Sequence, residues 1–116
     1  MIVSIIVPTY NESKTIIKLL EEVNAQRSLG TMFEVIVVND GSTDNTTKLI
    51  NENIQLVDKY ISLETNSGKG AAVKQGLLQA TGDYILFQDA DLEYSPSDYH
   101  KFFKLIDNKS PDVIMG

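Results

Sequence analysis

Cysteine is absent from this chain of 116 residues, which excludes disulfide bonds, thiolate nucleophiles and cysteine-based zinc sites and fits a reducing compartment. Histidine occurs once, at His100, so a metal site built on several imidazoles is excluded. We expect His100 to have a surface or packing role. No apolar stretch approaches the length of a membrane span, and the apolar start at residues 2–7 lacks the features of a signal peptide. We therefore expect a chain that is soluble by itself.

Basic residues are outnumbered, 10 against 16 acidic ones, which gives a formal net charge of −6. A negative surface repels polyphosphate, so we exclude nucleic acid as a partner. An anionic small substrate would need a local cation, either a side chain or a metal ion. The length allows one domain, residues 1–116, and the sequence shows no internal repeat, low-complexity tract or linker.

Apolar runs alternate with amphipathic segments along the chain. We expect strands at residues 2–7, 33–38, 57–63, 84–88 and 112–115. Helices are expected at residues 14–26, after a cap at Asp44, at 71–80 and from Ser95-Pro96 to about 106. Pro8 should end the first strand, and Val73, Leu77 and Leu78 should face the core. Continuous apolar strands separated by helices indicate an α/β fold, with a mainly parallel sheet flanked by helices.

Three polar clusters follow predicted strands, in the segments 8–12, 39–44 and 89–91. In parallel sheets the carboxyl ends of the strands meet at one edge, where ligands bind. The third cluster places Asp89 and Asp91 directly after a buried strand, and oxygen ligands of this kind suit Mg²⁺ or Mn²⁺ together with substrate phosphates. Glu93 could add another oxygen. An isolated Asp-x-Asp is usually a solvated turn, but this position beside two other polar strand ends favours a metal site.

The other two clusters could contact a nucleotide. Asp40 could accept hydrogen bonds from a base edge or a ribose, whereas the following Ser42-Thr43-Asp44 is more typical of a turn and a helix cap. Tyr10 could stack on a base and Glu12 could reach a ribose hydroxyl. Equally, Asn11 could cap the first helix and Glu12 could complement its dipole.

A glycine-rich turn, Asn66-Ser67-Gly68-Lys69-Gly70, precedes the third predicted helix. The start of a helix after such a turn is a natural anion site, although the spacing of a P-loop is absent. Lys69 supplies a cation in an otherwise acidic chain, and we expect it near the diphosphate of a substrate.

Taken together, these segments resemble the family 2 glycosyltransferases with the GT-A fold. The resemblance covers nearly the whole chain, through Ser4 to Glu12, Val37 to Asp44, Asn66 to Ala72, Gly82-Asp83-Tyr84 and Gln88 to Pro96. The form Asp-Ala-Asp-Leu-Glu-Tyr is especially similar to the polyprenol-phosphate (dolichol-phosphate) mannose or glucose synthase branch. The fold implied is the nucleotide-binding half of a GT-A, Rossmann-like domain.

The resemblance also implies roles. Nucleotide-sugar contacts are expected at Pro8, Thr9, Tyr10, Glu12, Val38, Asp40, Lys69, Asp89 and Ala90, with Asp40 reading the base. Asp89, Asp91 and Glu93 are expected to hold Mg²⁺ or Mn²⁺. Such enzymes pass a sugar from a UDP- or GDP-sugar to an acceptor, here polyprenyl phosphate or a glycan, with inversion. Asn39 replaces an acidic residue common in the family, which could alter donor choice.

The family's catalytic domain is about twice this length, so we expect the catalytic base and the acceptor half downstream of Gly116, and this part alone could be inactive. We expect a cytoplasmic location, with the full-length protein at the cytoplasmic face of a membrane. Self-association through an open sheet edge is a further option.

Three alternative functions remain. A sugar-1-phosphate nucleotidyltransferase would need a basic glycine-rich loop after the first strand, which residues 8–12 do not provide. A phospho-acceptor receiver domain would need paired acidic residues after that strand and a lysine after the last strand, but Lys109 precedes the latter. A non-catalytic nucleotide-binding fragment is the third alternative.

Overall fold

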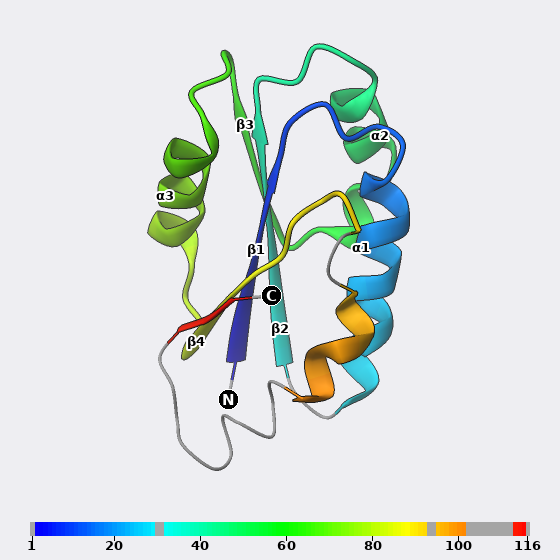
Figure 1. Ribbon diagram of the computed structural model, residues 1–116, viewed down its shortest axis with the longest axis vertical. Coiled ribbons are helices and arrows are strands. Elements are labelled where there is room, and N and C mark those ends of the chain that lie inside the picture. The colour runs from blue at the N-terminus through cyan, green and yellow to red at the C-terminus, as the bar shows by residue number, and fades with distance from the viewer. Residues whose placement is uncertain (1, 30–31, 93–94, 102–112, 116) are drawn as a thin grey trace.

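Five parallel strands form the sheet in the computed structural model, which describes residues 2–29, 32–92, 95–101 and 113–115 (Figure 1). The spatial order is β3-β2-β1-β4-β5. The strands are β1 (Ile2–Thr9), β2 (Met32–Asp40), β3 (Lys59–Leu63), β4 (Tyr84–Phe87) and β5 (Val113–Met115). Every neighbouring pair is parallel, which confirms the predicted α/β class.

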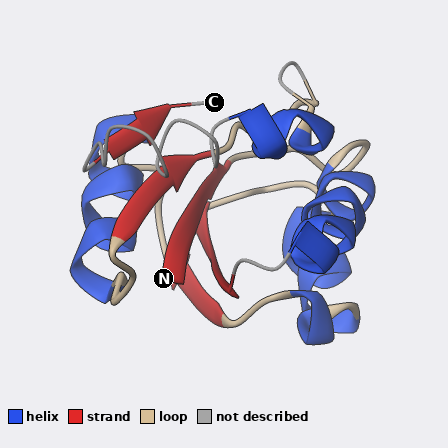
Figure 2. Ribbon diagram, turned by 90° about the horizontal axis from the view of Figure 1, so that it is seen from below, coloured by secondary structure: helices blue, strands red, loops and turns tan. Residues whose placement is uncertain are grey.

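Helices cover both faces of the sheet (Figures 1 and 2). One face carries α1 (Ile16–Ala25), which continues into the 3₁₀ helix η1 (Gln26–Leu29), together with α2 (Thr46–Glu52) and η2 (Ile54–Leu56). The opposite face carries α3 (Lys69–Gln79). The short helix η3 (Pro96–Asp98) follows β4 and leads into helical residues 99–101. Among the described residues, no helix combines the length and apolar character that crossing a bilayer requires.

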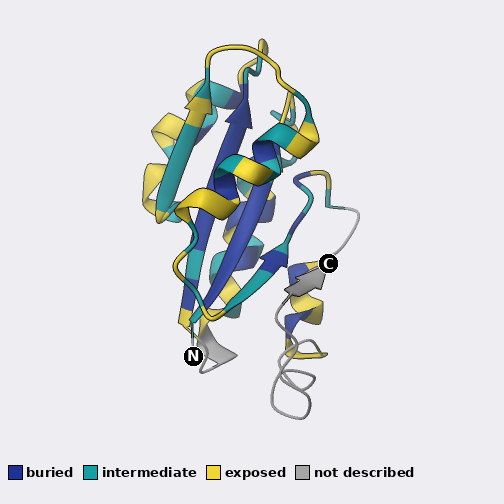
Figure 3. Ribbon diagram, turned by 90° about the vertical axis from the view of Figure 1, so that its left-hand side faces the viewer, coloured by how far each residue is buried: buried dark blue, intermediate teal, exposed yellow. Residues whose placement is uncertain are grey.

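Alternate residues of the central strands point to opposite faces of the sheet and belong to two separate hydrophobic cores. Val3, Ile5 and Val7 of β1 pack with Leu19 and Leu20 of α1 on one face. On the other face, a second cluster joins strand residues to the helix α3, through Ile6, Ile36, Val38 and Ala72. Figure 3 shows the resulting buried strands between helices whose outer surfaces are exposed. Burial on both faces explains why β1 and β2 have continuous apolar sequences instead of alternating ones.

Pro8 does not end β1, which continues to Thr9 with Pro8 opposite Val38 of β2; that prediction was wrong. The carbonyl oxygen of Ile6 accepts a hydrogen bond from Gln88 N, so Ile6 bonds toward β4. Residues two apart in a strand bond to the same side. The missing N–H of Pro8 would therefore point beyond the end of β4, which stops at Phe87, and the proline removes no hydrogen bond from the sheet.

The inward face of α3 also differs from the prediction. Leu77 and Leu78 are exposed, at 44% and 67%, and the buried residues are Ala72 and Gly76. A Cβ atom on Gly76 would lie 2.6 Å from Cγ2 of Ile6, which is buried in the sheet. Small residues therefore let α3 approach β1 closely, and the larger leucines are on the outer side of the helix.

Other boundaries differ by one or two residues. Helix α1 begins at Ile16 and β3 at Lys59, whereas β2 extends through Asn39 and Asp40. The predicted start at Ser95-Pro96 is confirmed, because the Ser95 hydroxyl accepts a hydrogen bond from Ser97 N at 3.3 Å. The part of that helix expected beyond residue 101 lies outside the described residues. His100 is exposed, as expected, with Nδ1 3.0 Å from the Ser97 carbonyl oxygen.

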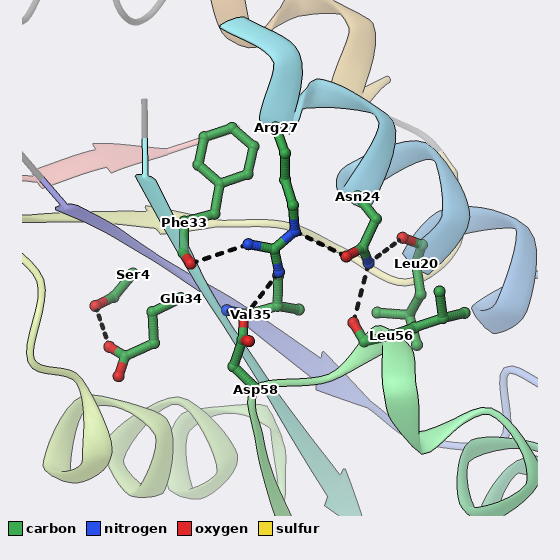
Figure 4. Close-up of polar contacts among 9 residues, drawn as sticks. All are labelled: Ser4, Leu20, Asn24, Arg27, Phe33, Glu34, Val35, Leu56 and Asp58. Carbon is green, nitrogen blue, oxygen red and sulfur yellow. Dashed lines mark hydrogen bonds and ion pairs between the residues drawn. The ribbon is translucent and has the colours of Figure 1, made fainter. Parts of the chain in front are cut away.

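Polar contacts tie the elements together at the amino-terminal edge of the sheet (Figure 4). The Arg27 guanidinium donates to the carboxylate of Asp58 at 2.9 Å, to the Phe33 carbonyl oxygen at 3.2 Å and to Asn24 Oδ1 at 2.9 Å. The same Asp58 carboxylate accepts from Val35 N at 2.8 Å. One arginine therefore links the end of α1 to the starts of β2 and β3.

A second network at this edge centres on Glu34 of β2. Its carboxylate accepts hydrogen bonds from the hydroxyl of Ser4 at 2.7 Å and from both N and Oγ1 of Thr81 at 2.9 Å. Lys59 Nζ completes the set at 2.6 Å. Three strands and the loop before β4 therefore converge on one carboxylate.

Candidate functional site

A cavity of about 550 Å³ opens at the carboxyl edge of the sheet. Four separate segments form it: the end of β1 with the loop that follows, the last residue of β2, the turn and first helical turn of α3, and the segment after β4. Its lining residues are Pro8, Thr9, Tyr10, Glu12, Asp40, Asn66, Gly68, Lys69, Ala72, Asp89, Ala90 and Asp91. Parallel strand order brings these segments together, as expected for ligand sites of open α/β sheets.

The structure brings nine of the predicted site residues to this cavity, namely Pro8, Thr9, Tyr10, Glu12, Asp40, Lys69, Asp89, Ala90 and Asp91. Val38 is wholly buried in the core below and does not line the cavity. Glu93 lies outside the described residues. Three lining residues were not predicted. Asn66 and Gly68 belong to the glycine-rich turn and could have been included with Lys69, whereas Ala72 gives no signal beyond its small size.

Asp40 is 3% exposed, and its carboxylate organises the turn before α3. It accepts hydrogen bonds from Ser67 N at 2.8 Å, Gly68 N at 2.9 Å and Asn66 Nδ2 at 3.1 Å. These two backbone amides belong to the turn from which we predicted anion binding. Asp40 already supplies the anion there, so a substrate phosphate would have to find other partners.

Gly41 lets the end of β2 approach this turn. Its φ is +68°, and a Cβ atom at this position would overlap the backbone of Thr65 and Asn66. Only glycine fits both the left-handed conformation and the close approach. The hydrogen bonds from the backbone amides of Ser67 and Gly68 to the Asp40 carboxylate therefore depend on glycine at position 41.

Asn39 has a structural role beside the cavity and is not among its lining residues. Its Oδ1 accepts from the backbone N and the hydroxyl of Ser42, and its Nδ2 donates to Thr47 Oγ1 at 2.8 Å and to the Tyr60 hydroxyl at 3.0 Å. The side chain is 1% exposed. An effect of Asn39 on donor choice would therefore have to pass through the loop after β2.

Asn11 joins the first two polar clusters. It adopts a left-handed conformation, with φ of 51°. Its Oδ1 accepts from Thr43 N at 2.8 Å and Asp44 N at 3.3 Å, and its own N donates to the Ser42 hydroxyl. Asn11 therefore does not cap α1, whose N-cap position is Thr15. The predicted cap at Asp44 is displaced by one residue, because the N-cap position of α2 is Asn45; Asp44 Oδ1 nevertheless accepts from Thr46 N, the first residue of the helix, at 2.9 Å.

Lys69 and Asp89 form an ion pair across the cavity, with Nζ 2.5 Å from Oδ1. Lys69 is the first residue of α3, and Asp89 follows β4 on the neighbouring wall. The lysine side chain is 67% exposed and the aspartate side chain 28%. Among the described residues that line the cavity, Lys69 is the only lysine or arginine.

Buried polar groups support the segment that carries Asp89. The Tyr99 hydroxyl donates to Gln88 Oε1 at 2.8 Å, and Gln88 Nε2 donates to the Asp89 carbonyl oxygen at 3.1 Å. Burial raises the pKa of Tyr99 far above its usual value, so this hydroxyl keeps its proton. The Thr15 hydroxyl also donates to the Ala90 carbonyl oxygen of this segment.

Negative charge accumulates on one side of the cavity. Burial raises the pKa of Glu12, and repulsion from Asp91, Asp44 and Asp89 raises it further, outweighing a hydrogen bond from Thr15. Within the described ranges no group of three acidic or histidine side chains has the arrangement of a metal site. Two carboxylates such as Asp89 and Asp91 nevertheless fit Mg²⁺ or Mn²⁺, which proteins often hold by one or two carboxylates together with substrate phosphates.

Two curated relatives resemble this chain over most of its length. The dolichyl-phosphate beta-glucosyltransferase of Saccharomyces cerevisiae is 38% identical over 112 residues, which cover 89% of this chain and 34% of the yeast protein. The undecaprenyl-phosphate 4-deoxy-4-formamido-L-arabinose transferase of Proteus mirabilis is 36% identical over 100 residues, 83% of this chain and 31% of that protein. The chain thus spans about a third of the relatives that it matches.

Solved structures share the fold. S. aureus TarS 1-349 in complex with UDP-GlcNAc matches with a TM-score of 0.79 and 38% identity, over 93% of this chain and 32% of that one. The mannosyltransferase PcManGT from Pyrobaculum calidifontis, in complex with GDP-Man and Mn²⁺, matches with a TM-score of 0.77 and 29% identity, over 90% and 32%. Residues 4–116 match the family described as glycosyl transferase family 2. The chain, with its GT-A architecture, therefore belongs to the family 2 glycosyltransferases.

Proposed function

We propose that this chain is the donor-binding part of a glycosyltransferase that passes a sugar from a UDP- or GDP-sugar to an acceptor, with a divalent metal and with inversion at the anomeric carbon. The cavity carries the proposal, because nine residues predicted from the sequence line it from four separate segments. Its volume lies within the usual range of small-molecule sites. The complexes of TarS with UDP-GlcNAc and of PcManGT with GDP-Man support a donor of this class.

The nucleoside would occupy the part of the cavity near Tyr10 and Asp40. Tyr10 is 44% exposed, so its ring is available to stack on a base. Asp40 Oδ1 accepts one protein hydrogen bond, from Ser67 N, and a carboxylate oxygen can accept a second. We assign that second bond to the N–H on the edge of the base, and assign a ribose hydroxyl to Glu12.

The diphosphate would lie between Lys69 and the aspartates. Asp89 and Asp91 would hold Mg²⁺ or Mn²⁺, with Glu93 proposed as a further oxygen ligand, and the Mn²⁺ in the PcManGT complex supports this assignment. The metal, when bound, would neutralise the diphosphate and stabilise it as a leaving group. Lys69 would contact the phosphate oxygens, because the amides of Ser67 and Gly68 are already bonded to Asp40.

The acceptor we propose is a polyprenyl phosphate, by analogy with the two relatives, whose names specify dolichyl phosphate and undecaprenyl phosphate; a glycan is the alternative. An inverting transfer also needs a base to remove the proton of an acceptor hydroxyl, or an acceptor that is already an anion. For a glycan hydroxyl we place this base beyond Gly116, whereas a polyprenyl phosphate is already an anion and needs none. A lipid acceptor would place the full-length protein at the cytoplasmic face of a membrane.

Calorimetric titration of UDP-glucose, UDP-GlcNAc and GDP-mannose tests the donor site. We expect one of them to bind in the presence of Mn²⁺ and to lose most of its affinity in EDTA. Asp89→Asn and Asp91→Asn should abolish the Mn²⁺ dependence. Asp98→Asn is a matched control, since Asp98 lies in η3 outside the cavity. Equal binding with Mn²⁺ and with EDTA would contradict the assignment of the aspartates.

A further inference from the structure

We infer that Lys69 serves as the counter-cation of Asp89 while the cavity holds no donor. When a donor binds, the lysine moves to the diphosphate, and the Asp89 carboxylate becomes available to the divalent metal. The inference rests on the proposed function, because it requires a diphosphate donor and a metal at Asp89 and Asp91. It makes Lys69 a positioning residue that couples metal binding to nucleotide binding.

The geometry of the ion pair places the lysine in competition with a metal. Lys69 Nζ lies 2.5 Å from Asp89 Oδ1. Mg²⁺ binds carboxylate oxygens at about 2.1 Å, so a divalent ion on this oxygen would lie within a few ångströms of the ammonium group. Two cations that close repel each other strongly. Metal binding to Asp89 therefore requires the lysine to move.

The lysine is the partner able to move. Its side chain is 67% exposed, against 28% for Asp89, and the ammonium group lies at the end of a flexible four-carbon chain. Asp89, in contrast, is fixed through its backbone, because Gln88 Nε2 donates to its carbonyl oxygen and Tyr99 holds Gln88. We therefore expect the aspartate to stay in place while the lysine turns.

A diphosphate would find few other donors in this cavity. Lys69 is the only basic side chain among the described lining residues, and Asp40 occupies the amides of Ser67 and Gly68. Burial raises the pKa of Glu12, and repulsion from the surrounding carboxylates raises it further. A diphosphate that bound while Lys69 remained paired with Asp89 would add its negative charge to this repulsion. The donor and the metal therefore each make the other's binding more favourable, which is a positive coupling between two sites.

Binding of Mn²⁺ to the purified chain, followed by the EPR signal of the free ion, tests the inference. Titrations are made without nucleotide, with UDP and with GDP. Without nucleotide, Lys69→Met should bind Mn²⁺ roughly fivefold more tightly than the unmodified chain, as expected from loss of an exposed ion pair. UDP or GDP should then raise the Mn²⁺ affinity of Lys69→Met less than that of the unmodified chain. Lys69→Arg should restore the original coupling.

Lys74→Met is the matched control, because Lys74 lies on the same helix, is exposed and is outside the cavity. It should leave Mn²⁺ binding unchanged; an equal tightening in this variant would mean a general charge effect and would overturn the inference. Unchanged or weaker Mn²⁺ binding by Lys69→Met, beside normal Mn²⁺–nucleotide binding by the unmodified chain, would overturn the inference and leave the proposed function standing. If no variant binds Mn²⁺ with either nucleotide, both are wrong.

Discussion

The hydroxyl of Thr15, just before α1, donates a 2.6 Å hydrogen bond to the carbonyl oxygen of Ala90, the residue between the two aspartates assigned to the metal. The two residues are 75 positions apart in the sequence. The bond fixes the backbone of the Asp-Ala-Asp segment against the helix on one face of the sheet. Thr15 thus positions the segment that we propose to hold the metal, without being a metal ligand itself.

Replacing Thr15 by valine keeps the shape of the side chain and removes the donor. We expect the free energy of unfolding to fall by about 1 kcal/mol, the usual cost of one such hydrogen bond. We also expect weaker binding of UDP or GDP in the presence of Mn²⁺. Urea unfolding and calorimetry measure the two effects. Thr15→Ser retains the hydroxyl and should behave like the unmodified chain; unchanged stability and unchanged nucleotide binding in Thr15→Val would contradict the role given to this hydrogen bond.

Two glycines of α3 should respond to alanine in opposite ways. In Gly76→Ala the new methyl group would lie 2.6 Å from Ile6 Cγ2, which is buried in the sheet, so we expect a loss of roughly 1–3 kcal/mol from overpacking. Gly70→Ala meets no atom within 4 Å and should gain about 0.5–1 kcal/mol from helix propensity. Thermal unfolding of both variants measures this contrast, and a stabilising Gly76→Ala would contradict the close packing of α3 on β1.

Glu34 should make the stability of the chain depend on pH in the acid range. Burial alone would raise its pKa, but hydrogen bonds from Lys59, Thr81 and Ser4 outweigh burial and lower the pKa from 4.5 to about 2. The ionised carboxylate therefore stabilises the fold above about pH 4.5. That contribution, up to about 3 kcal/mol, is lost as the pH falls from 4.5 toward 2.

Glu34→Gln tests this dependence by urea unfolding at several pH values. The variant should be less stable at pH 7, and its stability should change less than that of the unmodified chain between pH 5 and pH 3. Glu52→Gln, at an exposed position in α2, is the control. Parallel pH profiles for Glu34→Gln and the unmodified chain would show that other carboxylates are responsible.

Asp40→Asn should destabilise the turn before α3. The backbone amides of Ser67 and Gly68 donate to different carboxylate oxygens, so the amide NH₂ group of asparagine would face one of these two donors. Leaving one of these donors unpaired costs about 1–3 kcal/mol. Hydrogen exchange of the Ser67 and Gly68 amides should therefore speed up. Asn66→Ala removes one side-chain donor to Asp40 and should leave these two amides protected; equal effects would contradict the role given to Asp40.

The strands and their carboxyl-end clusters could be predicted because buried parallel strands require continuous apolar sequences, and polar residues then follow them. The role of Asp40 in the fold could not, since its partners, Ser67 and Gly68, lie 27 and 28 residues away and donate through their backbone. The inward face of α3 was predicted wrongly because hydrophobicity favoured Leu77 over Gly76. Which residue fits against Ile6 depends on the distance between helix and sheet, and no local pattern encodes that distance.

Glu34 is six residues before Asp40 in β2, a distance of roughly 20 Å along an extended strand. Its three hydrogen bonds and one ion pair hold β1, β2, β3 and the loop before β4 at the end of the sheet away from the cavity. The contacts that join the strands at this end of the sheet are therefore independent of the cavity loops. Attempts to re-engineer the donor preference of this chain can therefore vary cavity positions other than Asp40 and Gly41, which hold the turn before α3, provided that the carboxylate at the far end is left intact.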